Sequence, residues 1–487
     1  MSEIPPDQAE RLLADGRAAE ALFAAEIALA RRPGDVALQS LRDRAMAAIS
    51  AMDPRFAALQ LDAAVNAERP AAHLELGHAY GLRGQWRDAE RCFAQAAALD
   101  PRSVEAHASL ALACFNLGAA EAAERHCLQA LAIDDAHVVA SQTLASLLDA
   151  RGEHAAARRQ LDRAYGRQAL FDLGVPDAAL RVLVLATASA GNVPYKAIMP
   201  PARYSRLVWY MEHARAAETP DPDRYDIVFN TIGDADLAEH SLTAVEGFVA
   251  GASRPVLNLP GPVMRTRRDR LGALLEGLPG VVVPRTVRLT EADLAAKGLP
   301  ALAEAHGFSL PLLIRPVGLH GGQGLVRLDD REALALHRSG PGDHYLIQYL
   351  DYASPDGLWR KYRMLFVGGR PFAYHQAISG HWLVHHDTAG MGGSPERQAE
   401  EARFLDDPAA VLGETGMAAI AAIGKALGLD YCGVDFAVLA DGRVLVFEAN
   451  ATMLAHFEDP DGPYAYKNPA VQAVAEAFQA LLAGRAG

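Results

Sequence analysis

The sequence predicts a multidomain chain in which an all-α region of helical repeats precedes a larger α+β region. At 487 residues the chain is too long for one hydrophobic core. Residues 1–168 are rich in Ala and Leu with helical periodicity, whereas strand-like apolar runs alternate with helical segments from about residue 175. Near the C-terminus, Asp441-Gly442 joins two apolar runs, which is typical of a β-hairpin.

Bulk composition excludes several classes of protein. A net charge of −14 argues against a general nucleic-acid binder, which needs a basic surface to neutralise phosphates. No run of about 18 uncharged apolar residues predicts a membrane span, and the acidic N-terminus lacks the features of a signal peptide. We therefore expect a cytoplasmic protein with no membrane or nucleic-acid partner. Its four cysteines show no CxxC spacing and are expected to be reduced thiols.

The first 168 residues contain a repeat of thirty-four residues. Small and large apolar residues recur at fixed positions, so that two antiparallel helices can approach closely and the next pair can fill the gap. The recurring residues are Leu76, Gly77, Tyr80, Ala89, Phe93, Ala96 and Pro101, then Leu110, Ala111, Cys114, Ala123, Cys127 and Ala130, then Leu144, Ala145, Leu148, Ala157, Leu161 and Ala164. A half-unit with Gly16, Ala21, Ala28 and Pro33 fits as well, whereas residues 35–69 fit poorly.

This pattern resembles the tetratricopeptide repeat. The resemblance implies a helical solenoid whose concave groove binds a protein or peptide partner. A homodimer interface or a spacer are alternative uses of such an array.

The next segment predicts a small open α/β sheet. Residues 180–186, 204–210, 225–230 and 255–258 read as strands, and residues 242–249 as a helix. Polar residues follow two of these strands, and the loops at the carboxyl ends of such strands hold ligands. Asn192, Asn230 and Asp234 are therefore substrate-pocket candidates, although the same residues are equally typical of turns.

A basic run and a glycine-rich loop follow. Residues 265–270 contain four arginines, which either bind phosphate or decorate a solvated helix. An apolar strand at residues 312–316 carries Arg315, and the loop 318–324 (Gly-Leu-His320-Gly-Gly-Gln-Gly) leads into another strand. The order strand, loop, strand matches neither a Walker loop nor a Rossmann turn. Glycines there allow backbone N–H groups to approach phosphate oxygens.

Two further hairpins carry charged residues. Residues 361–376 turn at Gly368-Gly369, and the simple register places Arg363 opposite Tyr374 and Lys361 opposite Gln376. Lys361 and Arg363 then share one face, which suits an anion.

In the last hairpin, a two-residue turn at Asp441-Gly442 places Asp435 opposite Glu448, and Asn450 points to the same face as Glu448. Facing carboxylates repel, so a hard cation such as Mg²⁺ is the expected partner. An exposed hairpin with two solvated acids is the alternative, although its flanking residues are apolar.

Taken in order, these elements resemble the ATP-grasp superfamily, over residues 178–485. The closest likeness is to the ribosomal-protein glutamate ligase and glutathione synthetase branch. The resemblance implies a small α/β pre-ATP-grasp subdomain at residues 178–262, a nucleotide-lid subdomain at 263–340 and a metal-binding C-terminal subdomain at 341–487. The tetratricopeptide-like domain occupies residues 1–168.

The resemblance also implies a role for individual residues. Arg315 and Arg270 stand where the family has nucleotide-binding lysines, and Arg363 matches a phosphate-binding Arg, although Lys361 stands where an Asp is usual. Gly321, Gly322 and Gly324 would close on the triphosphate, while Gln348, Tyr349 and Leu350 would meet the adenine. Asp435, Glu448 and Asn450 would hold two Mg²⁺ ions.

The segment after the second hairpin, residues 375–386, contains four histidines but no cysteine, and is a poor zinc site. We expect His375 to support a phosphate beside the catalytic Arg315 and Arg363, and Trp382 and His385 to line an acceptor pocket. The implied function is an ATP-dependent carboxylate–amine ligase that forms an acylphosphate, acting on a peptide or protein recruited by the repeats. A nucleotide-binding scaffold without turnover is the main alternative, and a kinase-like transfer is a third.

Overall fold

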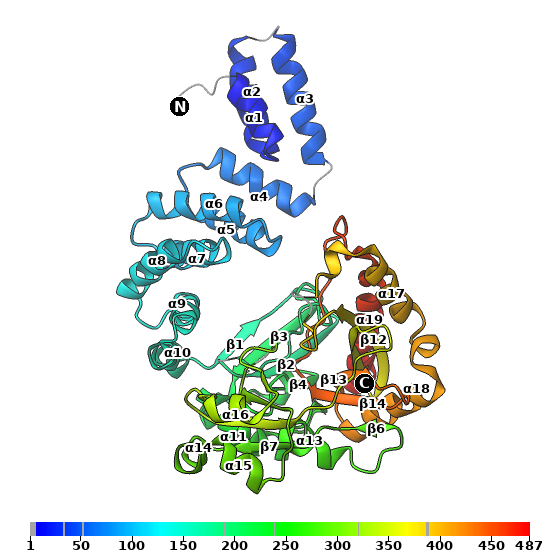
Figure 1. Ribbon diagram of the computed structural model, residues 1–487. Helices are drawn as coiled ribbons and strands as arrows, with labels where there is room; N and C mark the ends of the chain where they lie inside the picture. The colour runs from blue at the N-terminus through cyan, green and yellow to red at the C-terminus, as the bar shows by residue number, and fades with distance from the viewer. Residues whose placement is uncertain are drawn as a thin grey trace. The chain divides into compact units, whose positions relative to one another are not determined.

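The chain folds into two compact units, Met1–Gln168 and Ala169–Gly487. The computed structural model describes residues 6–32, 35–50, 53–188, 190–237, 239–319, 321–385 and 389–487 (Figure 1). Pro33, His320 and His386, which the sequence singles out, lie outside the described residues. The predicted fold class, helical repeats followed by an α+β region, is confirmed.

The first unit is all-α in its described residues. Helices α5–α10 pack as consecutive pairs (Figure 1). The helices are α1 (Pro6–Ala14), α2 (Ala18–Arg31), α3 (Val36–Ser50), α4 (Pro54–Val65), α5 (Pro70–Leu82), α6 (Trp86–Leu99), α7 (Val104–Asn116), α8 (Ala120–Ile133), α9 (Val138–Ala150) and α10 (His154–Arg167).

Small residues make the close pairing possible. Ala89 and Ala96 are fully buried, and a methyl group on Gly77 would lie 2.5 Å from the ring of Phe93. The turns inside successive pairs use glycines thirty-four residues apart, Gly84, Gly118 and Gly152, all with left-handed φ. Gly16 has the same conformation two periods earlier, whereas Ser50 occupies the position between, in the segment that fits the repeat poorly.

The second unit begins with a five-stranded sheet of order β1-β3-β2-β4-β5. Strands β2 to β5 are parallel to their neighbours and β1, which the sequence did not predict, is antiparallel. Helix α11 (Glu239–Ala250) follows β4. The strands are β1 (Leu170–Leu173), β2 (Leu180–Ala186), β3 (Tyr204–Tyr210), β4 (Ile227–Asn230) and β5 (Val256–Leu257).

Two sheets whose strands are mainly antiparallel complete this unit. The first, of order β7-β10-β8-β9, contains β7 (Thr286–Leu289), β8 (Leu312–Pro316), β9 (Val326–Leu328) and β10 (His344–Gln348), with α14 (Glu291–Lys297), α15 (Leu299–Ala305) and α16 (Arg331–Leu336). The second, of order β12-β11-β13-β14-β6, contains β6 (Val281–Val282), which is parallel to β14, together with β11 (Trp359–Val367), β12 (Arg370–Ser379), β13 (Tyr431–Val438) and β14 (Val444–Asn450).

Helices cover one face of the larger antiparallel sheet (Figure 1). Phe366 and Phe436 pack there with Ile420 and Phe478 in the main hydrophobic core. The helices of this part are α12 (Pro260–Arg265), α13 (Arg268–Leu274), α17 (Pro395–Asp406), α18 (Pro408–Leu427) and α19 (Asn468–Ala486), and short 3₁₀ turns occupy Met211–His213, Ala216–Glu218, Pro222–Arg224, Met391–Gly393 and Ala465–Lys467.

In the described part of the chain, α18 alone is long and apolar enough to cross a membrane. Its backbone is kinked at Gly413, and its buried residues Ile420, Ile423 and Leu427 belong to the main core. We therefore describe α18 as a core helix of this unit.

Two β-bulges correct the predicted registers. In the β11–β12 hairpin, the expected pairing holds from the turn to Met364, after which an extra residue shifts it, so that Arg363 faces His375 and Lys361 faces Ala377. The predicted partners, Tyr374 and Gln376, are therefore wrong.

In the β13–β14 hairpin the turn is one residue longer than predicted, since Leu439 N–H bonds to Arg443. A bulge next to Phe436 then restores the pairing of Asp435 with Glu448. The predicted acid pair is thus present, but it depends on a bulge that the turn signal does not show.

The packing of the core can be tested at Gly424. Ala at this position should destabilise the unit, because its methyl group would lie 2.5 Å from the Phe366 ring and 2.9 Å from the Gly369 carbonyl oxygen. We expect Gly424→Ala to lower the free energy of unfolding by about 1–3 kcal/mol. The matched control is Gly484→Ala in α19, where nothing lies within 4 Å; it should be neutral or stabilising by about 0.5–1 kcal/mol. Urea unfolding followed by tryptophan fluorescence measures both, and equal midpoints for the two variants would contradict this packing.

Candidate functional site

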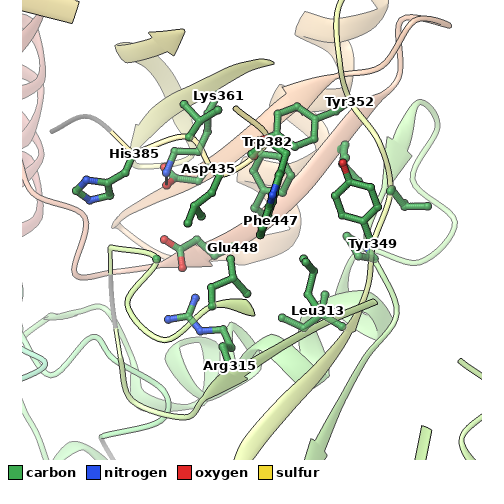
Figure 2. A pocket seen from close by; sticks show the side chains of 18 of the residues that line it. Leu313, Arg315, Tyr349, Tyr352, Lys361, Trp382, His385, Asp435, Phe447 and Glu448 are labelled. Carbon is green, nitrogen blue, oxygen red and sulfur yellow. Dashed lines mark hydrogen bonds and ion pairs between the residues drawn. The ribbon is translucent and has the colours of Figure 1, made fainter. Parts of the chain in front are cut away.

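A cavity of about 240 Å³ lies between the two antiparallel sheets. Strands β8 and β10 with the glycine loop form one wall, and β11–β14 form the other. Aromatic side chains gather on one side, while Arg315 and the carboxylate of Glu448 face each other across the opening (Figure 2). The charged residues of the lining are Arg268, Arg315, Lys361, Arg363, Asp435 and Glu448.

The apolar side of the cavity forms a slot with aromatic walls. The rings of Tyr352 and Phe447 lie 5.0 Å apart, and those of Tyr349 and Trp382 lie 6.0 Å apart with their planes perpendicular. The segment after β12, residues 380–385, is called the strap and carries Trp382. Tyr352 Oη donates to the backbone oxygen of Trp382 at 2.5 Å, which fixes the strap. The predicted nucleotide residues Gln348, Tyr349 and Leu350 all line this slot, so the structure brings them together.

In the β13–β14 bulge, Phe447 of β14 is the extra residue, and this makes the wall both aromatic and charged. Side chains normally alternate between the two faces of a strand, but the bulge allows the successive residues Phe447 and Glu448 both to line the cavity. An aromatic surface and a carboxylate therefore lie next to each other on one strand.

Asp435 is fully engaged by two cations. Its Oδ1 accepts from Arg363 Nε at 2.6 Å, and its Oδ2 accepts from Arg363 Nη2 at 2.9 Å and from Lys361 Nζ at 3.0 Å. Arg363 and Asp435 are directly paired residues of β11 and β13. Burial raises the pKa of Asp435, but the charges of Arg363 and Lys361 outweigh it and hold the pKa well below its usual range.

Glu448 pairs with Arg268, whereas Arg270 was the residue predicted to bind the nucleotide. Arg268 Nη2 donates to Glu448 Oε2, and both side chains are mostly buried. Burial raises the pKa of Glu448, and the Arg268 charge brings it below its ordinary value. Arg270 is exposed and does not line the cavity, because two residues along a helix turn a side chain by about 200°. Arg268, and not the predicted Arg270, is therefore the arginine of this helix that lines the cavity.

Arg315 is a buried cation that faces the cavity. It is 6% exposed, and its Nη2 donates to the Leu319 carbonyl in the glycine loop. Burial, together with the nearby charge of Arg268, lowers the pKa of the guanidinium to about 10. Its Nε has no hydrogen-bond partner in the described part of the chain. A buried N–H group without a hydrogen-bond partner is a favourable contact for an anion.

The glycine loop packs against the strap after β12. Gly321 and Gly322 line the cavity with left-handed φ, and a Cβ at either would press on His385 at 3.0 Å or Leu383 at 3.3 Å. Gly324 does not line the cavity. Its missing Cβ makes room for Pro316 at 2.8 Å, so its role is to close the loop onto β8.

His375 lines the cavity but belongs to a buried polar network. Its Nδ1 lies 2.5 Å from Oε1 of Glu401, which is completely buried on α17. Glu401 also accepts from Tyr466 Oη at 2.6 Å and lies 3.5 Å from Lys467 Nζ. Glu401, Tyr466 and Lys467 were not predicted, because no local pattern links residues this far apart in the sequence.

The three polar candidates of the first sheet are used by the loops themselves. Asn192 exchanges hydrogen bonds with the Thr187 backbone, and Asn230 Nδ2 donates to the Asn258 carbonyl. Asp234 Oδ1 accepts from two backbone N–H groups after it. Of the two readings of these residues, turn formation is the one that the contacts support.

The residues predicted to hold metal ions are partly engaged by other groups of the protein. Within the described residues, no group of three or more His, Cys, Asp or Glu side chains is arranged to hold a metal ion. Glu448 has one oxygen bonded to Arg268, whereas both oxygens of Asp435 are bonded to cations. Asn450 lies outside the cavity lining, and its Oδ1 accepts from Thr452 Oγ1 at 3.0 Å. Of the two acids, Glu448 therefore keeps one carboxylate oxygen outside its ion pair with Arg268.

Comparisons with known proteins give limited similarity. Residues 70–103 match the tetratricopeptide repeat family. A search of curated proteins finds no significant match. Among solved structures, the chain is similar to the D-alanine–D-alanine ligase from Bacillus anthracis complexed with ATP, with 13% identity and a TM-score of 0.34 over 63% of this chain and 99% of that chain.

It is also similar to the VanG D-Ala:D-Ser ligase from Enterococcus faecalis, with 13% identity and a TM-score of 0.36 over 61% of this chain and 99% of that chain. A thermophilic TPR protein from Thermus thermophilus matches at 24% identity and a TM-score of 0.22, over 34% of this chain and 92% of that chain. Because these identities and scores are low, we base the function on the cavity itself.

The buried network around Glu401 predicts a pH dependence of stability. Burial raises the pKa of Glu401, but His375, Lys467 and Tyr466 lower it to about 2. A carboxylate with a lowered folded-state pKa stabilises the fold above its unfolded pKa and loses that effect as the pH falls toward the folded value. Between pH 6 and pH 3, wild type should lose about 2 kcal/mol more unfolding free energy than Glu401→Gln.

Urea unfolding at a series of pH values tests this expectation. The exposed Glu414→Gln serves as the control and should follow the wild-type curve. Parallel curves for wild type and Glu401→Gln would show that the network does not depress this pKa.

Proposed function

We propose that residues 169–487 form an ATP-dependent carboxylate–amine ligase of the ATP-grasp type. The observation that carries this proposal is the cavity itself. It places an aromatic slot, a cluster of four cations and a pair of acids side by side beneath a glycine loop. A nucleoside triphosphate requires these three surfaces, a flat apolar one for its base and charged ones for its phosphates and metal.

The nucleotide would lie along the cavity. Its base would occupy the slot formed by Tyr349, Tyr352, Trp382 and Phe447, with the backbone of Gln348, Tyr349 and Leu350 at its edge. Arg315 and Arg268 would bind the phosphates, because buried guanidinium groups suit phosphate oxygens. The backbone of Gly321 and Gly322 would close over them.

A bound Mg²⁺ would neutralise developing negative charge during phosphoryl transfer. Glu448 would hold it, together with oxygens of the nucleotide. The remaining work of this chain is positioning and electrostatic stabilisation by Arg315 and Arg363. His375, held by Glu401, would orient groups at the same end of the cavity.

The proposed reaction has two steps. A substrate carboxylate oxygen attacks the γ-phosphorus, the bond to the β-phosphate oxygen breaks and ADP leaves, giving an acylphosphate. An amine then attacks the acyl carbon, inorganic phosphate leaves and the amine nitrogen loses a proton. No nucleophilic side chain of the protein is required, which agrees with the charged groups that line the cavity.

One observation favours a second candidate, a nucleotide-binding scaffold without turnover. Both acids of the cavity form ion pairs with the protein's own cations, an arrangement that is already neutralised without a metal. A scaffold would bind ATP and release no phosphate with any pair of acid and amine.

Turnover tests the role of Glu448. Glu448→Ala should abolish phosphate release from ATP, because it removes the acid that would hold the metal and leaves Arg268 buried without its partner. Wild type should release phosphate only when a carboxylate and an amine are both supplied. The exposed Glu414→Ala should keep wild-type activity, and circular dichroism checks that both variants fold. Unchanged turnover in Glu448→Ala would refute the ligase assignment, and ATP binding without phosphate release in wild type would favour the scaffold.

The helical repeats have a proposed role in substrate recruitment. We propose that Met1–Gln168 binds a protein or peptide that carries one of the reacting groups, because tethering raises the effective concentration of a weakly bound chain. Deleting residues 1–168 should lower turnover of that natural substrate about 10²-fold, the lower end of the gain expected from tethering. Turnover of a small free acid and amine should not change. Equal turnover of the natural substrate by both forms would count against this role.

A further inference from the structure

Lys361 is a cation in an unusual place. It stands where the ATP-grasp resemblance leads us to expect an aspartate, and its Nζ lies 3.0 Å from Oδ2 of Asp435, an acid expected to hold a metal. The pairing of β11 with β13 brings this about, because it sets Arg363 opposite Asp435, and Lys361, two residues earlier on β11, points to the same face. In Figure 2 the side chains of Lys361 and Asp435 lie next to each other on the side of the cavity opposite Arg315.

Arg363 alone would neutralise Asp435. It binds both carboxylate oxygens, at 2.6 and 2.9 Å, in the bidentate geometry that satisfies an arginine–carboxylate pair. The charge of Lys361 is therefore surplus to that pair. The Asp435 side chain is only 2% exposed, whereas that of Lys361 is 19% exposed at the cavity.

The charges of the cavity lining do not balance. Among the described residues that line it, four are arginine or lysine and two are aspartate or glutamate. The lining therefore has an excess of two positive charges. A nucleoside triphosphate carries roughly four negative charges near neutral pH, and one Mg²⁺ reduces this to about two. One nucleotide with one Mg²⁺ therefore matches the cavity in charge, and a second Mg²⁺ would restore an excess of about two positive charges.

Asp435 is also poorly placed to bind a second Mg²⁺. Such an ion would have to compete with Lys361 and Arg363 for a carboxylate that already accepts three charge-assisted hydrogen bonds. The ammonium and the guanidinium would remain close to the ion, and like charges at short range repel strongly in a buried site.

We propose that the Lys361 ammonium is a built-in cation that replaces one of the two Mg²⁺ ions implied by the ATP-grasp resemblance, so that this chain binds its nucleotide with a single divalent ion. The inference rests on the proposed function, since it specifies how that site holds ATP. Lys361 then belongs to the phosphate-binding machinery. Its charge stabilises the triphosphate even when no metal is present.

Metal stoichiometry is the first test. Mn²⁺ is titrated into the full chain with a non-hydrolysable ATP analogue, and the loss of the free Mn²⁺ electron paramagnetic resonance signal counts the bound ions. Wild type should bind one ion per chain and Lys361→Asp should bind two. The control Lys425→Asp, at an exposed position on α18, should bind one.

Each outcome separates the inference from the function on which it rests. Two ions in wild type, or one ion in a folded Lys361→Asp, would overturn the role of Lys361 and leave the ligase proposal standing. Failure of wild type to bind the analogue at any Mn²⁺ concentration would overturn both.

The second test does not depend on folding of the aspartate variant. Calorimetry in EDTA measures binding of the analogue without metal. Lys361→Gln should weaken this binding about 10- to 100-fold, as expected for loss of one charge-assisted contact. Lys425→Gln should have no effect, and equal metal-free affinity of Lys361→Gln and wild type would overturn the proposal.

Discussion

The ion pair between Arg363 and Asp435 is the interaction on which the cavity depends. The two residues face each other on the central strands β11 and β13 of a sheet whose opposite face is the main core. Asp435 is 1% exposed, and a buried carboxylate without a partner is destabilising by about 3–5 kcal/mol. The bidentate pair removes that penalty and fixes the register of both strands. The neighbouring contacts of Asp435 with Glu448 and Lys361 then follow from the strand pairing.

The cavity also requires irregularities in otherwise regular strands. Without the bulge in β14, Phe447 would lie opposite Asp435, and Phe447 and Glu448 could not both line the cavity. Without the bulge in β12, Arg363 would face Tyr374 instead of His375, which connects this sheet to Glu401 on α17. Bulges bend and twist a strand locally, and here each one turns a charged or polar side chain toward the same space.

How much of this the sequence predicts depends on how local each signal is. The thirty-four-residue period and the strand–loop–strand around Gly321 are local patterns, and both elements are present. The pairing of Asp435 with Glu448 was predicted from a two-residue turn, and it occurs through a longer turn and a compensating bulge. The sequence pointed to Arg270, whereas Arg268 lies at the cavity, because the rotation of α13 against β14 decides which arginine faces it. Glu401 and Lys467 were missed because they meet His375 only through tertiary packing.

The chemistry of its lysines supports a distinct role for position 361. Arginine outnumbers lysine 41 to five in this chain, and Arg stands at both positions, 270 and 315, where the resemblance expects a nucleotide-binding lysine. Lysine nevertheless occupies positions 361 and 467, and both ammonium groups lie against carboxylates inside the second unit. Arginine presents a planar fork that engages both oxygens of one carboxylate, whereas an ammonium is a compact point charge with three donors. Arg363 already provides the fork at Asp435. A second cation beside Arg363 has to contact the carboxylate and a phosphate at the same time, which requires a small centre of positive charge. Among side chains, the lysine ammonium is the one that most resembles a divalent ion in this respect.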